Sequence, residues 1–119
     1  MVNNYKELDV WLKSRQLVKI IYELTASFPQ QEKYGLISQM NRAAISIPSN
    51  IAEGIGRNHP KETIQFLYIA KGSLYELETQ IYLSIDLGFC LDKNAVFIFD
   101  KITEVRKLLI GFIKHHQSK

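Results

Sequence analysis

The side chains best suited to chemistry are charged and amide groups on two neighbouring segments. They are Gln39, Arg42, Asn50 and Glu53 within residues 33–57, and Glu76, Glu78 and Gln80 within residues 60–88. Carboxylates that share a pocket suit acid–base catalysis, so an enzyme would bring Glu53, Glu76 and Glu78 together. However, each acid has an Arg, Gln or Asn nearby that can satisfy it, and no nucleophile stands beside them. We therefore expect a structural polar network that sets helix register, not an active site.

Other reactive residue types also lack the partners that chemistry needs. His115 and His116 are adjacent in sequence, so on a helix they point about 100° apart and cannot chelate one ion, and His59 lies in a turn. Cys90 has apolar neighbours, which is typical of a buried small hydrophobe. Gly54 lacks the preceding strand and the following GK[ST] of a phosphate loop, so it predicts a close approach of two helices. We expect no metal, no cofactor and no small-molecule substrate.

The basic balance of the chain permits contact with nucleic acid. The net charge is +3 and the pI is about 9.0, but Lys and Arg are spread along the sequence and do not form one cluster. The residues that we expect to contact a nucleic acid are Lys13, Arg15, Lys19, Arg57, Lys61, Arg106, Lys107 and Lys114.

These residues must be positioned by helices. Apolar residues recur at three- and four-residue steps over residues 9–28, 33–57, 60–88 and 92–115, and no segment has the pattern of a strand. The prediction is an all-α single domain, 1–119, folded as an antiparallel up-down-up-down four-helix bundle. Asp9 and Asp92 are expected N-caps, Pro60 is expected to begin a helix, and Gly88 is expected to end one.

Pro48 lies in the middle of the second predicted helix. The apolar period continues in phase across it, from Met40 and Ile47 to Ile51 and Ile55. This continuity favours one proline-kinked helix over two shorter ones, although a break at Pro48 is the alternative.

A row of tyrosines, Tyr68, Tyr75 and Tyr82, repeats every seven residues in the third predicted helix. Such rings can stack on exposed bases, with Lys71 beside them for a phosphate, but they more often lie half-buried at a subunit boundary. Each helix also has a second apolar or small-residue stripe, and Trp11 belongs to that of the first. We therefore expect a closed symmetric homo-oligomer with Tyr68, Tyr75, Tyr82 and Trp11 at its interface.

Neither a membrane nor an export route is indicated. No apolar run approaches the roughly 18 residues of a membrane span. The first residues lack the basic, apolar and small-residue order of a signal peptide, so we expect a cytoplasmic protein without a membrane partner.

Three stretches carry a family resemblance. LDVW, FP..E.YGL..Q..RAAISIPSNIAEGIGR and FL.IA.GSL.ELETQ..L...LG together resemble the four-helix-bundle proteins of 23S rRNA intervening sequences, the S23 ribosomal protein family. The resemblance implies a left-handed bundle, a homopentameric ring, no catalytic residues, and kinship with the nucleic-acid-binding accessory proteins of diversity-generating retroelements. The family usually has two arginines where this chain has Asn41-Arg42, so any anion contact of the first arginine is lost here.

Three functions follow as hypotheses. The first is a non-enzymatic homo-oligomer, a pentamer on the resemblance, that binds RNA or an RNA–protein complex. The alternative is a protein–protein interaction scaffold without direct nucleic-acid contact. An enzyme is the third and the least supported, because it requires perturbed carboxylates in one pocket.

Overall fold

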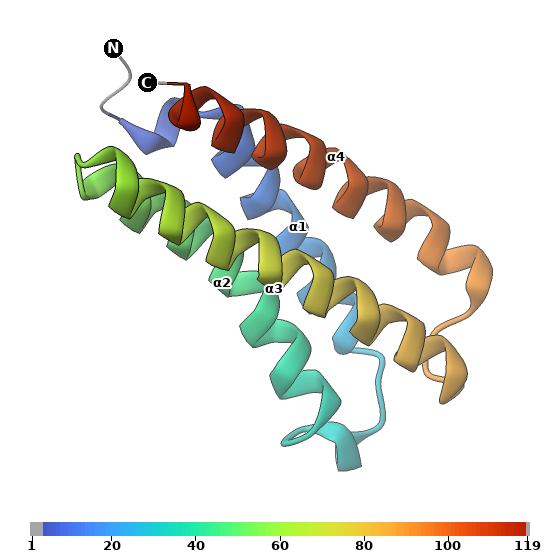
Figure 1. Ribbon diagram of the computed structural model, residues 1–119. Coiled ribbons are helices and arrows are strands. Elements are labelled where there is room, and N and C mark those ends of the chain that lie inside the picture. Colours follow the sequence, from blue (N-terminus) through green and yellow to red (C-terminus); the bar gives the residue numbers. More distant parts are fainter. Residues whose placement is uncertain (1–3, 119) are drawn as a thin grey trace.

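The amphipathic segments of the sequence fold into four long helices, α1 (Asp9–Thr25), α2 (Leu36–Gly56), α3 (Pro60–Asp86) and α4 (Asp92–Gln117). The structure is a computed structural model that describes residues 4–118, so residues 1–3 and 119 of the predicted domain lie outside it. Consecutive helices run in opposite directions, as Figure 1 shows. Within the described range there is no strand. The predicted all-α, up-down-up-down four-helix bundle is confirmed.

Each helix packs against two others. Contacts join α1 to α2, α2 to α3, α3 to α4, and α4 back to α1. Among the described residues, no Cα atom of α1 comes within 8 Å of one in α3, so these two helices are diagonal. The buried apolar side chains come from all four helices and include Leu17, Ile21, Met40, Ile47, Ile51, Leu67, Leu74, Leu77, Ile81, Ile102 and Leu109. The fold is therefore held by one shared core.

The helix ends differ in detail from the expectations. Asp9 and Asp92 are each the first helical residue, and Leu8 and Leu91 occupy the N-cap positions without a side-chain hydrogen bond. The predicted N-caps were therefore wrong by one residue, although both carboxylates still lie at the positive helix end. Pro60 begins α3 as predicted. α3 ends at Asp86, and Gly88 follows two residues later with φ +80°, a conformation that favours glycine.

Helices α1 and α2 are shorter at the turn that joins them than predicted. α1 ends at Thr25, three residues before the predicted end, and Pro29 follows with the extended ψ of 142°. A short 3-10 turn, Gln30–Glu32, precedes α2, so α2 begins at Leu36 and not at residue 33. A second 3-10 turn, Tyr5–Glu7, leads into α1.

α2 continues without a break through Pro48. It changes direction part-way along its length in Figure 1, as expected for a helix that contains proline. Within the turn around the ring, Asn50 Nδ2 donates to the Ser46 carbonyl at 2.8 Å. The prediction of one kinked helix is confirmed, because apolar side chains before and after Pro48 enter the same core.

α2 and α3 approach each other closely near the turn that joins them. A Cβ atom added to Gly54 would lie 2.9 Å from Phe66 Cβ and 3.1 Å from the Thr63 carbonyl oxygen. The Thr63 hydroxyl donates to the Gly54 carbonyl at 2.6 Å across this joint. Gly54 therefore permits a close helix approach, as its sequence setting predicted.

Candidate nucleic-acid interface

The outward side of α3 next to α4 carries the tyrosine row. Tyr68, Tyr75 and Tyr82 are 46%, 47% and 55% exposed. Because seven residues make nearly two helical turns, the three side chains leave α3 on the same side. The row is therefore half-buried along the seam between α3 and α4.

Two cationic side chains lie against these rings. Lys71 Nζ is 5.7 Å from the ring centre of Tyr68 and 6.0 Å from that of Tyr75. The Arg106 guanidinium, from α4, is 5.7 Å from the Tyr75 ring centre. The seam thus alternates aromatic rings with positive charges.

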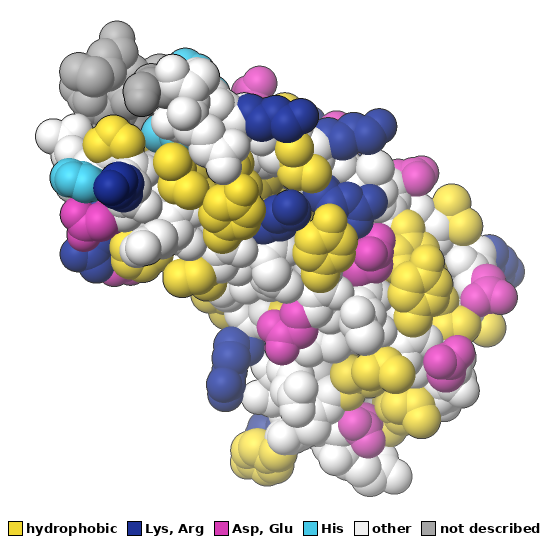
Figure 2. Space-filling model, viewed as in Figure 1, with side chains coloured by type: hydrophobic (Ala, Val, Ile, Leu, Met, Phe, Trp, Pro, Cys, Tyr) yellow, Lys and Arg dark blue, Asp and Glu magenta, His cyan; other side chains and the backbone are white. Residues whose placement is uncertain are grey.

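α4 contributes the rest of the charge. The Gln117 side-chain amide donates to the Tyr68 hydroxyl at 3.0 Å, which brings the last turn of α4 against α3. Lys107 and Lys114 are exposed and seven residues apart, so they share one side of α4. Figure 2 shows Lys and Arg side chains gathered over α3 and α4 on this face, with hydrophobic and aromatic side chains between them. We call Tyr68, Lys71, Tyr75, Arg106, Lys107 and Lys114 the α3–α4 basic patch.

One carboxylate belongs to the same seam. Arg106 Nη1 donates to Glu78 Oε2 at 3.2 Å, and both side chains are partly buried. This ion pair joins α3 to α4 and holds Arg106 over Tyr75. The patch residues carry four positive charges and Glu78 pairs with one of them, which leaves an excess of positive charge that the spacing of Lys and Arg along the sequence did not reveal.

The structure does not bring all the predicted nucleic-acid contacts together. Of these, Arg106, Lys107 and Lys114 lie in the basic patch, and Lys61 lies seven residues before Tyr68 at the start of α3. The others lie on α1 or at the end of α2. Two of these, Lys13 and Arg57, are near carboxylates, at 4.0 Å from Glu104 and 3.0 Å from Glu53.

Arg15 and Lys19 are exposed on α1. The Arg15 guanidinium is 5.3 Å from the Trp11 ring centre, and Trp11 also contacts Tyr5 edge-on at 5.2 Å. Trp11 therefore lies on the helix diagonal to α3, away from the tyrosine row with which it was grouped as an interface residue.

Lys71 was predicted to lie beside the tyrosine rings but was not among the eight predicted nucleic-acid contacts. Its position between Tyr68 and Tyr75, at spacings of three and four residues, was the available signal. Those spacings place a helical side chain beside both rings.

The residues of the predicted polar network fall into separate groups. Asn50 donates to Ser46 Oγ at 2.9 Å, and Ser46 and Ser73 share a hydrogen bond of 2.8 Å between α2 and α3. Glu53 pairs with Arg57 within α2, and Glu78 pairs with Arg106 of α4. The polar contact between α2 and α3 next to Asn50 is thus made by two serines, neither of which belongs to the predicted network.

Four other members of that set have no hydrogen bond or ion pair across the helices within the described part of the chain. Gln39, Arg42 and Glu76 are exposed, whereas Gln80 is buried and its Oε1 has no donor there. The two charged residues of these four, Arg42 and Glu76, consequently face solvent on the outer side of α2 and α3.

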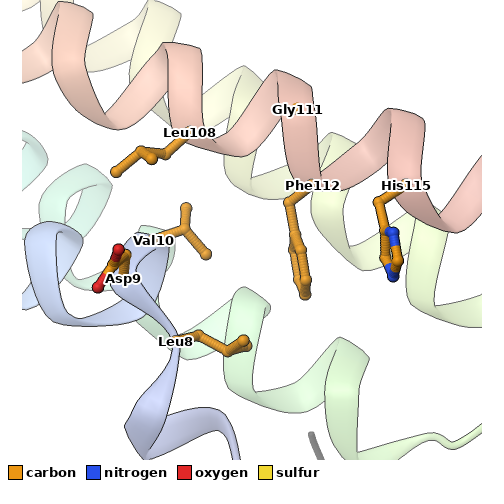
Figure 3. Close-up of a pocket in the computed structure, with 7 residues that line it drawn as sticks. All are labelled: Leu8, Asp9, Val10, Leu108, Gly111, Phe112 and His115. Carbon is orange, nitrogen blue, oxygen red and sulfur yellow. The ribbon is translucent and has the colours of Figure 1, made fainter. Parts of the chain in front are cut away.

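An open pocket of about 260 Å³ lies between the start of α1 and the second half of α4. Figure 3 shows its lining, made of Leu8, Asp9, Val10, Leu108, Gly111, Phe112 and His115. Asp9 and His115 are its only titratable lining residues, and the walls are mostly apolar. None of Glu53, Glu76 and Glu78 lines it, so the three acids do not share this pocket.

Cys90 is buried in the turn between α3 and α4. Burial raises the pKa of its thiol, and the nearby Asp92 carboxylate raises it further. A raised pKa disfavours the reactive thiolate, in agreement with the prediction of a buried hydrophobe. Within residues 4–118, no group of three or more His, Cys, Asp or Glu residues is arranged to hold a metal ion. No helix in that range is long and apolar enough to span a bilayer.

Comparison with known proteins decides the family. The family model of the 23S rRNA-intervening sequence protein matches residues 6–111, which is most of the chain. The chain belongs to this family. A similar solved structure is that of a protein with unknown function from the S23 ribosomal protein family of Bacteroides thetaiotaomicron. It is 28% identical, with a TM-score of 0.78 over 88% of this chain and 98% of the other.

The match confirms the family resemblance seen in the three sequence stretches. No curated protein matches the chain significantly. Neither the family description nor the description of the solved neighbour states an enzymatic activity.

Proposed function

We propose that this protein is a non-enzymatic, homo-oligomeric RNA-binding module, and that the α3–α4 basic patch is its RNA contact. The observation that carries the proposal is a pair of half-exposed tyrosine rings with two cations, Lys71 and Arg106, lying over them, and two further exposed lysines on α4. Lys and Arg neutralise phosphates and release counterions, while aromatic rings accept bases. A clustered patch of this composition fits a nucleic acid better than a general solvated surface.

The arrangement of the acids supports a role without catalysis. Glu53 forms an ion pair with Arg57, and Glu78 forms one with Arg106 on another helix. Acid–base catalysis needs carboxylates that face one substrate, and these two are directed to different partners.

The opposite side of α3 supports self-association. We call Arg42, Ser46 and Asn50 of α2, with Ile69, Ser73, Glu76, Gln80 and Leu83 of α3, the α2–α3 face. Ile69 and Leu83 are 52% and 45% exposed there. Arg42 and Glu76 have opposite charges and no ion pair among the described residues, so they are available to a neighbouring copy. Exposed apolar residues beside complementary charges suit a homomeric contact, and the family resemblance implies five copies.

RNA titration at two salt concentrations tests the RNA contact. We expect fluorescence anisotropy of a labelled unstructured RNA to show binding whose log–log salt slope is about −0.7 per phosphate contacted, or about −3 for four contacts. Lys71→Gln combined with Lys114→Gln should weaken binding and make the slope shallower by about 1.4. Lys93→Gln is the matched control, because Lys93 is exposed in the first turn of α4, about 20 Å along the helix from Lys107.

Absent binding, or an affinity that does not change with salt, would refute the RNA contact. Equal effects of the double variant and of Lys93→Gln would show that the patch is not the site. Specific recovery of a protein from nuclease-treated lysate, together with absent RNA binding, would favour the scaffold alternative.

A further inference from the structure

We propose that the α3–α4 basic patch recognises unpaired RNA bases by stacking them on Tyr68 and Tyr75, with Lys71 as the main phosphate contact between the two rings. This inference rests on the proposed RNA-binding function and adds the class of RNA that the patch selects. It predicts a preference for single-stranded over duplex RNA.

The rings are already held in place. The Tyr68 hydroxyl accepts a hydrogen bond from Gln117 of α4, and the Tyr75 ring lies under the Arg106 guanidinium. About half of each side chain remains exposed. A ring that is fixed before binding loses little conformational freedom when a base stacks on it, which favours affinity.

Lys71 is the cation best placed for a phosphate between two stacked bases. Its Nζ lies within about 6 Å of both ring centres, and it has no ion pair among the described residues. Exposed cation–π contacts are weak, so a phosphate can draw the flexible Lys71 side chain away and uncover ring surface for a base. Arg106 is less free, because Glu78 already holds it at 3.2 Å.

A duplex would use only part of this surface. The base faces of a duplex are covered by neighbouring base pairs, so a duplex offers the patch phosphates and groove edges but no stacking partner. An unpaired strand offers both exposed base faces and phosphates. The combination of half-exposed rings with an unpaired cation between them therefore favours the unpaired strand.

Tyr82 differs from the other two tyrosines. Its ring packs against Phe99 of α4 at 4.6 Å between centres. Among the described residues, no Lys or Arg lies over it as Lys71 lies over Tyr68 and Tyr75. We therefore place the stacking positions at Tyr68 and Tyr75 only.

The test compares a labelled 12-nucleotide unstructured RNA with a 12-base-pair RNA duplex, by anisotropy at one fixed salt concentration. Tyr75→Ala should weaken single-strand binding by about 5- to 150-fold, the range expected for the loss of one stacked base. Duplex binding should change less than about 2-fold, and Tyr75→Phe should keep both affinities because it keeps the ring. Tyr22→Ala is the matched control, since Tyr22 is 45% exposed but lies on α1.

The outcomes separate this inference from the function on which it rests. If Tyr75→Ala weakens single-strand and duplex binding equally, or if Tyr75→Phe is as harmful as Tyr75→Ala, stacking is refuted. If the Lys71 and Lys114 double variant weakens both RNA forms but Tyr75→Ala changes neither, RNA binding stands and the preference fails. Absent wild-type binding to either RNA overturns both. Tyr68→Ala gives a second, independent test should Tyr75→Ala fail to fold.

Discussion

Cys90 shows how the position of a residue decides its chemistry. Its apolar sequence neighbours predicted burial, and the structure places it in the turn after Gly88 with Asp92 nearby. The raised thiol pKa follows from this environment, because both burial and a neighbouring carboxylate disfavour the thiolate. Chemistry that depends on adjacent residues could thus be predicted from the sequence. Chemistry that depends on another helix, such as the ion pair of Glu78 with Arg106, could not.

The raised pKa of Cys90 predicts a loss of stability in alkali. The folded state holds the thiol proton more tightly than the unfolded state, so the stabilisation is complete below the unfolded pKa, about 8.5, and is lost as pH rises through the folded pKa. The urea midpoint should therefore fall less between pH 7 and pH 10 in Cys90→Ala than in the wild type. Any loss of stability that the substitution causes equally at both pH values does not affect this comparison. An equal fall in both proteins would contradict this prediction.

At the scale of the helices, the period of the apolar residues and the positions of glycine and proline predicted most of the structure. The continuous apolar period correctly predicted that α2 runs through Pro48, and Gly54 correctly predicted a close approach. The rotation of α3 against α4 was not readable, because it depends on how four side-chain surfaces pack at once. Spacing within α3 placed Lys71 beside the tyrosine rings, but Arg106 reaches Tyr75 only after that packing is set, so its place in the basic patch could not be predicted.

Two glycine-to-alanine substitutions should change stability in opposite directions, because only Gly54 lies at the close approach of α2 and α3. Gly54→Ala should lower the free energy of unfolding by about 1–3 kcal/mol, because the new Cβ would lie 2.9 Å from Phe66 Cβ. Gly111→Ala is the control: Gly111 lies inside α4 and has nothing within 4 Å of an added Cβ. It should raise stability by about 0.5–1 kcal/mol through helix propensity. Urea denaturation measures both, and similar changes in the two variants would show that the joint is not tightly packed.

At the scale of the whole molecule, α3 borders two exposed surfaces of different character. The basic patch lies toward α4, and the α2–α3 face lies toward α2. The surplus of apolar stripes in the sequence indicated that some surface should be covered. It did not separate these two sides, since both belong to one helix and their characters depend on the neighbouring helix.

The α2–α3 face predicts an assembly that one charge should disrupt. Light scattering should give about 69 kDa for five copies of the 13.8 kDa chain. Ile69→Glu should reduce that mass, because it places a charge within the apolar contact, whereas Val96→Glu, at an exposed site in α4, should not. A wild-type mass of one copy would contradict the proposed assembly, and the absorbance ratio of the same peak reports co-purified RNA.

Because only α3 separates the basic patch from the α2–α3 face, each copy in a closed assembly would present its RNA site close to the interface with the next copy. Identical sites would then repeat around the assembly at short, fixed intervals. A long strand held at one site would have a high effective concentration at the neighbouring site. Weak contacts in each subunit could in this way add up to tight retention of extended RNA, while short fragments would dissociate quickly.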